Sequence, residues 1–122
     1  MDEITSVFVV ESREQLAALE SALLQLESSP DDDDTLNAIF RSAHTIKGGA
    51  GVIECDYIVA FTHVVENVLD RLREHAVKAS ADLIALLLGC ADHIGGLLGV
   101  LESGAEGPDA DLAAEGEALL GR

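Results

Sequence analysis

One segment constrains the fold more than any other: residues 36–53 combine a helical apolar pattern with three glycines. Apolar side chains recur at alternating spacings of three and four, which places them on one face of an α-helix: Leu36, Ile39, Ala43, Ile46, Ala50 and Ile53. We expect this face to be buried against other helices. Gly48, Gly49 and Gly51 together cost such a helix about 2 to 3 kcal/mol, so we expect a partner or a neighbouring helix to approach closely there.

His44 is the polar residue that this helix presents best for chemistry. It follows Ala43 by one position, so it lies about 100° away from that residue around the helix, at the edge of the core and open to water. Because helical side chains lean over the preceding turn, the missing side chain of Gly48 leaves the imidazole uncovered. The same side of the helix carries Phe40, Lys47, Gly48 and Gly51.

The charge pattern points to the same histidine. The chain has 23 acidic residues and a net charge of −16, yet residues 37–53 contain no acid. They contain Arg41 and Lys47, which lie three residues before and three after His44. A small basic region around a histidine in an acidic protein suits a transient dianion such as a phosphoryl group.

These residues also carry a family resemblance. Residues 40–51, FRSAHTIKGGAG, resemble the phosphoacceptor helix of histidine phosphotransfer (HPt) domains, and are most similar to the N-terminal P1 domain of CheA-type chemotaxis histidine kinases. The likeness extends to residues 62–70, THVVENVLD, and in outline to the whole chain. One departure is Glu54, where the family usually has a glycine, and this leaves open the shape of the turn after the helix.

A partner for His44 is predicted on the next helix. Glu66 follows Val65 just as His44 follows Ala43, and positions that flank the apolar faces of antiparallel neighbours can meet. A carboxylate that accepts a hydrogen bond from Nδ1 fixes the tautomer and offsets positive charge as Nε2 attacks. Seam geometry and the resemblance both assign this role to Glu66. Lys47 would lie near the phosphoryl oxygens, with weaker attraction from Arg41, and His63 would complete the polar cluster.

The resemblance implies a phosphorelay. His44 would accept a phosphoryl group from ATP on a separate histidine kinase catalytic domain and pass it to an aspartate of a CheY-like response regulator receiver domain. Docking would use the face around Phe40, Arg41, Gly48 and Gly51. Lys47 precedes its glycines, the reverse of a phosphate-binding P-loop, so we expect no cofactor here, with ATP and Mg²⁺ on the separate kinase domain. The chain is then a substrate and relay, and a segment of a larger kinase.

The other segments predict scaffold. Apolar periodicity indicates helices over residues 4–28, 57–75 and 82–101, and a short one that begins at Asp109 or Asp111. Asp33 or Asp34, and Asp56, are the expected N-caps. The fold class is therefore all-α: an antiparallel up-down-up-down four-helix bundle. It forms one domain over residues 1–122, with 102–122 as a linker plus a short fifth helix. His75 and His93 are expected at the surface or in loops.

Composition excludes several other classes. The net charge of −16 argues against nucleic acid and anionic membrane surfaces, which both require basic patches. The longest apolar run, residues 83–91, is too short to span a bilayer. Cys55 and Cys90 are isolated in the sequence, which favours reduced thiols and a cytoplasmic location.

Two alternatives remain open at this point. A metal-binding helical bundle could use His44, His63 and Glu66, although the chain lacks the Glu-x-x-His sets of di-iron bundles. A purely structural interaction module could bind another helix along an apolar edge. That reading leaves the glycines and the acid-free window unexplained.

Overall fold

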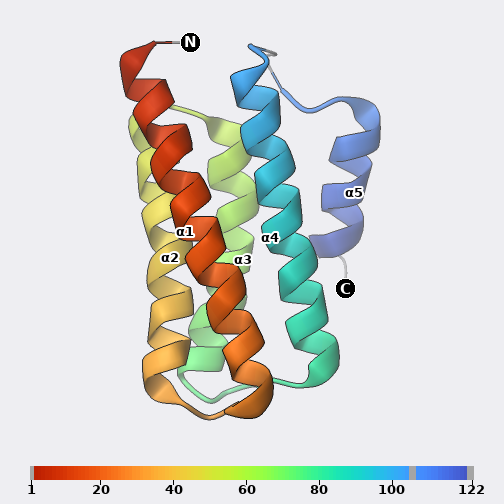
Figure 1. Cartoon of the computed structure of the whole chain (residues 1–122). Helices are drawn as coiled ribbons and strands as arrows, with labels where there is room; N and C mark the ends of the chain where they lie inside the picture. The colour runs from red at the N-terminus through yellow and green to blue at the C-terminus, as the bar shows by residue number, and fades with distance from the viewer. Residues whose placement is uncertain (1, 105–106, 121–122) are drawn as a thin grey trace.

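Five helices make up the described part of this computed structural model, residues 2–104 and 107–120, and no strand occurs there. They are α1 (Glu3–Ser28), α2 (Asp33–Val52), α3 (Asp56–Arg73), α4 (Ala81–Glu102) and α5 (Ala110–Leu120). The first four run alternately up and down, and α5 lies outside the bundle against α3 and α4 (Figure 1). The predicted fold class is confirmed.

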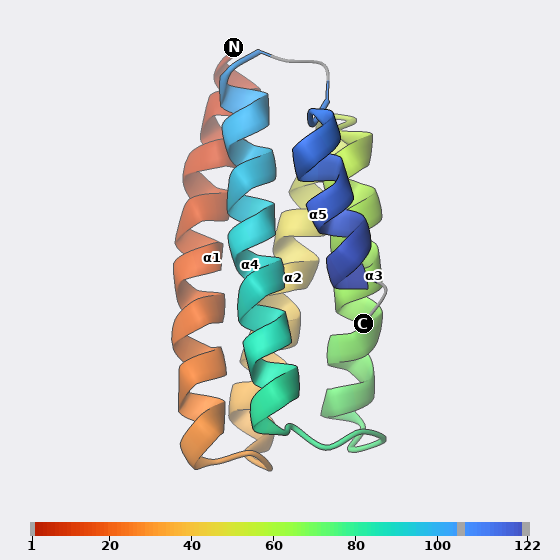
Figure 2. The ribbon, with the colours of Figure 1, turned by 90° about the vertical axis from the view of Figure 1, so that its right-hand side faces the viewer.

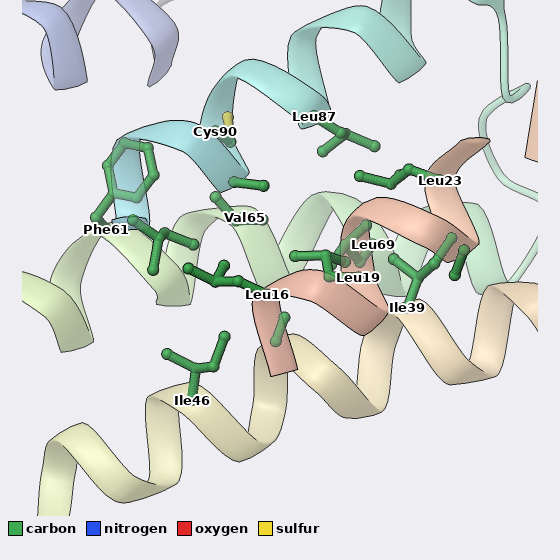
Figure 3. Packing of buried hydrophobic residues seen from close by; sticks show 14 of the residues in the cluster. Leu16, Leu19, Leu23, Ile39, Ile46, Phe61, Val65, Leu69, Leu87 and Cys90 are labelled. Carbon is green, nitrogen blue, oxygen red and sulfur yellow. The ribbon is translucent and has the colours of Figure 1, made fainter. Parts of the chain in front are cut away.

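A single apolar core runs through the four long helices. It is built from aliphatic side chains of all four, with Phe61 as an aromatic member (Figure 3). The apolar stripe predicted for α2 is buried from Leu36 to Ala50, while Ile53 is half-buried at the end of the helix. Cys55 and Cys90 are free and buried, and burial raises the pKa of the Cys90 thiol to about 11.

Side-chain caps start three of the helices. Asp2 accepts a hydrogen bond from the Thr5 amide at 2.7 Å, which lowers the pKa of Asp2, and Ser80 accepts one from the Leu83 amide at 3.1 Å. Asp109 caps α5 by accepting a hydrogen bond from the Leu112 amide at 2.8 Å. Of the two predicted start positions, Asp109 and Asp111, the first is therefore correct.

The predicted caps of α2 and α3 are wrong. Asp32 precedes α2 and its carboxylate accepts from the Thr35 hydroxyl rather than from a backbone amide, while Asp33 and Asp34 are already helical. Asp56 is likewise the first residue of α3, and Cys55 stands at the cap position without a side-chain bond. An acid in the first turn still interacts favourably with the helix dipole. The predicted acids therefore do mark the helix starts, but from inside the first turn rather than from the cap position.

Two helices end in a left-handed residue that is not glycine. After α2, Glu54 has φ 59°, its amide donates to the Gly51 carbonyl, and the Cys55 amide donates to the Ala50 carbonyl. After α3, His75 repeats the φ of 59° and the same pair of bonds. This is the Schellman motif, whose left-handed position normally favours glycine. The turn left open by Glu54 therefore forms, with a glutamate in a strained conformation.

The glycines of α4 explain how α5 docks. A Cβ at Gly89 would lie 3.4 Å from Leu119, and one at Gly96 would lie 3.5 Å from Leu112. These two leucines of α5 rest on α4 where side chains are missing. The contact also corrects the prediction for His93, which is only 3% exposed, packs on Phe61 and lies beneath Gly116. His75 is exposed at the turn, as predicted, and contacts Asp33.

One helix in the described residues, α4, is long and apolar enough by length and composition to cross a membrane. The predicted limit of residues 83–91 therefore understates its apolar length. In the structure α4 packs against α1, α3 and α5, with eight of its side chains buried. A helix at the core of a bundle passes the same test of composition.

Candidate functional site

His44 lies on the outer face of α2 with its side chain 61% exposed. The apolar side chains of α2 hold the helix against α1 and α3, so the imidazole is presented from a rigid element. No hydrogen bond or ion pair from Nε2 to the described residues is present. The ring is therefore anchored from its Nδ1 side and open to solvent at Nε2.

Glu66 on α3 provides that anchor. Its Oε2 lies 3.3 Å from His44 Nδ1 and 3.0 Å from Lys47 Nζ, and its side chain is only 13% exposed. The edge positions of the two helices meet as the seam argument predicted. One carboxylate oxygen therefore contacts both the imidazole and the ammonium group, in a half-sheltered position where charge interactions are stronger than in water.

Lys47 is placed differently from the expectation. Its side chain is 23% exposed and contacts Glu66, rather than extending into the open space in front of the imidazole. The ammonium group thus neutralises the carboxylate as the structure stands.

Phe40, already predicted on the docking face, stacks beside the His44 ring, and Arg73, which sequence reasoning missed, packs on Phe40 in turn. Phe40 lies one turn before His44, and the two rings are nearly parallel, with centroids 5.9 Å apart and an interplanar angle of 11°. The Arg73 guanidinium covers the Phe40 ring at 3.9 Å and is held by Asp70 at 2.6 Å. Arg73 follows Glu66 by seven residues, a spacing that puts both on one helix face. This spacing could have predicted that Arg73 lies on the same side of α3 as Glu66.

The three glycines of α2 divide into two kinds. A Cβ at Gly49 would lie 2.7 Å from Phe8 of α1, so this glycine permits close helix packing. Gly48 and Gly51 have no atom within 4 Å of a Cβ position, and both are exposed. These two leave an open strip beside His44 that a second protein can approach.

Other predicted residues stand apart from the cluster. His63 and Arg41 are exposed, and neither makes a hydrogen bond or an ion pair with the described residues. His63 therefore does not join His44 and Glu66, because it lies one turn earlier on α3 and extends into solvent. No group of three or more potential metal ligands occurs within residues 2–104 and 107–120, so the metal alternative has no ligand set there.

An exposed imidazole with a carboxylate at one nitrogen, a cation nearby and bare backbone beside it defines a class of helical domain that presents a histidine to another protein. Residues 3–104 match the model of the Hpt domain family. The chain belongs to this family, which confirms the resemblance seen in the sequence.

Several of the similar proteins are chemotaxis proteins named CheA. The chain is 41% identical over 104 residues to the chemotaxis protein CheA of Rhizobium meliloti, and 42% identical over 107 residues to that of Cereibacter sphaeroides. Each match covers 85% of this chain but only 14% and 16% of the relative. The chain therefore corresponds to a small part of those proteins.

Solved structures agree in fold. The CheA phosphotransferase domain of Thermotoga maritima is 32% identical, with a TM-score of 0.76 over 83% of this chain and 98% of that one. The phosphorylated P1 domain of CheA3, solved in complex with CheY6 from R. sphaeroides, is 25% identical, with a TM-score of 0.84 over 98% of this chain and 94% of that one.

Proposed function

We propose that this chain is a phosphorelay carrier in chemotaxis-type two-component signalling, with His44 as the phosphoacceptor. The observation that carries the proposal is the asymmetry of the imidazole: Nδ1 lies 3.3 Å from the Glu66 carboxylate, while the ring is largely exposed. Membership in the Hpt family supports it. The phosphorylated state of the P1 domain of CheA3 supports it as well.

The geometry supports a simple displacement. The proton stays on Nδ1, and this N–H donates a hydrogen bond to Glu66. The lone pair of Nε2 then attacks the γ-phosphorus of ATP, so that an N–P bond forms and the P–O bond to ADP breaks. Glu66 offsets the positive charge that develops on the ring. In the second transfer a carboxylate oxygen of an aspartate attacks the phosphorus, the N–P bond breaks, and its electrons return to Nε2.

Lys47 and Arg41 are proposed to act by charge. Lys47 would exchange Glu66 for the phosphoryl oxygens once the dianion is present, because a charge-assisted bond to a dianion is strong. Arg41 lies exposed one turn before His44 and contributes attraction without contact. Arg73 belongs with them as a third cation, held through Phe40.

The proposed partners are two separate domains. A histidine kinase catalytic domain supplies ATP and Mg²⁺, since this domain is proposed to hold no cofactor of its own, and a CheY-like receiver domain takes the phosphoryl group. The relatives are several times longer than this chain, which supports a place for it within a larger cytoplasmic kinase. Docking would use the strip formed by Phe40, Arg41, Gly48 and Gly51.

Labelling with the kinase catalytic domain of a CheA relative and γ-labelled ATP tests the proposal. We expect one acid-labile, base-stable phosphoryl group, absent in His44→Gln and retained in His63→Gln, an exposed histidine on the next helix. An acid-stable label, or a label that survives His44→Gln, would contradict the proposal.

A further inference from the structure

A second candidate binding surface lies on the other side of α3 from His44. In Figure 2, α5 runs beside α3 and α4 for only part of their length. Residues of α3, α4 and the C-terminal end of α5 line the part of the α3–α4 groove that α5 leaves open. A cavity of about 200 Å³ opens there. Its lining is almost entirely apolar and includes Val64, Val68, Leu83, Leu87, Cys90 and Leu119.

Helix α5 shows what kind of segment this groove accepts. Its Leu112 and Leu119 are seven residues apart and rest against Gly96 and Gly89 of α4. The open half of the groove continues directly from the Leu119 seat, between the same two helices. A second helix with leucine-like side chains at similar spacing would extend this packing, and would cover the exposed Val64 and Leu120.

One charged side chain of the groove indicates which polar residue a bound helix would carry. Arg71 is the charged side chain that lines the cavity, and it forms no ion pair with the described residues. The chain has 23 acids and only seven lysines and arginines, so an arginine that pairs with no carboxylate of the described residues is notable at this apolar rim. An acidic side chain would complete it with a charge-assisted bond.

We propose that the open half of the α3–α4 groove binds an amphipathic helix of another protein, with apolar residues at i, i+3 and i+7 and an acidic residue that pairs with Arg71. Such helix-in-groove binding is a common recognition mode. Val64, Val68 and Arg71 face the α4 side of α3, whereas Glu66 faces α2. The helix can therefore remain bound while His44 is engaged elsewhere.

Two synthetic helical peptides test this directly. Both carry leucines at i, i+3 and i+7, and they differ in one flanking residue, glutamate or lysine. We expect the glutamate peptide to bind the full chain and to shift amide resonances of Val64, Val68 and Leu83. Arg71→Glu should weaken it by about tenfold or more and favour the lysine peptide instead. Arg41→Glu, the same charge change on the opposite side, should leave affinity unchanged.

Four results would overturn the proposal. The peptides could fail to bind, or bind without regard to Arg71. Shifts confined to Gly89, Gly96 and Gly116 would mean that the peptide displaces α5 rather than extending it. Self-association of the chain that Arg71→Glu abolishes would assign the groove to a second copy.

Discussion

Glu66 is the residue on which the behaviour of the imidazole depends. Removing it by Glu66→Ala should leave the fold intact, because the side chain lies at the edge of the core. It should slow phosphorylation of His44 by about tenfold or more, since the Nδ1–H tautomer and the developing charge lose their partner. Initial rates with a kinase domain measure this.

If Glu66 holds the His44 ring in one tautomer, its removal should also be visible by spectroscopy. Nitrogen chemical shifts of the His44 ring report which nitrogen carries the proton, and Glu66→Ala should lower the share with the proton on Nδ1. Glu66→Gln keeps an acceptor without the charge and should fall between. An unchanged rate with an unchanged tautomer would remove Glu66 from the mechanism.

Gly48 is the residue whose enlargement should block docking without damage to the helix. A Cβ there meets nothing within 4 Å, and leucine is a better helix former than glycine. Gly48→Leu should therefore preserve or raise stability, yet slow transfer to a receiver domain by about tenfold. Gly99→Leu, at an equally open helical glycine of α4, is the matched control. Equal transfer rates for the two variants would place docking on another surface.

Glu54 offers a test of backbone strain. A left-handed conformation costs a non-glycine residue about 1 to 2 kcal/mol, partly offset by the entropy that glycine loses on folding. Glu54→Gly should therefore raise the free energy of unfolding by about 0.5 to 1 kcal/mol, measured by urea denaturation. Glu74→Gly, the same change at a right-handed helix end, should lower it. A loss of stability in both would mean that the Glu54 side chain matters more than its φ.

For single residues, the sequence predicted which positions face each other across two helices. The positions of His44 and Glu66 beside their apolar faces predicted that the two would meet across the α2–α3 seam. The contact of Lys47 with Glu66, and that of Arg73 with Phe40, depend on which rotamers long flexible side chains adopt. Register does not determine rotamers, so those contacts required coordinates.

At the scale of elements, α5 depends on one missing side chain. A Cβ at Gly116 would lie 2.7 Å from His93 Nε2, and His93 is buried with little room to move. Gly116→Ala should thus release α5 even though alanine raises its helix propensity. Hydrogen exchange of α5 amides should accelerate, while His44 phosphorylation stays unchanged. Ala118→Gly, at an exposed position, weakens the helix without that clash.

A double variant separates sterics from propensity. His93→Ala combined with Gly116→Ala removes the obstructing ring and should restore part of the protection lost in Gly116→Ala alone. If Gly116→Ala instead slows exchange, the contact with His93 is not what limits docking.

The elements themselves were largely predictable, and their contacts were not. Apolar periodicity predicted all five helices, but α4 was expected to be weakened by its glycines. Gly96 and Gly89 make room for Leu112 and Leu119 of α5, which lie 16 and 30 residues later in the chain. Local propensity does not show such contacts. His93 was assigned to the surface for the same reason: it lies outside the main apolar stripe of α4, and its burial depends on Phe61 of α3 and Gly116 of α5.

At the scale of the whole molecule, charge opposes folding. The net charge is −16, and compaction brings those charges together. Exposed ion pairs such as Arg73–Asp70 contribute little and weaken in salt, so relief of repulsion should dominate. Added NaCl should then raise Tm at pH 7, by about 4 °C for each 1 kcal/mol of relief.

The effect should vanish where the charge does. Near pH 4.2, the isoelectric point of the sequence, there is no net repulsion to screen, so Tm should be insensitive to NaCl in dilute samples. A rise of similar size at both pH values would assign the effect to salting-out of apolar surface instead. A fall in Tm with salt at pH 7 would mean that the ion pairs outweigh the repulsion. In that case the acidic surface is held by its few cations, Arg13 with Glu102 and Lys47 with Glu66 among them.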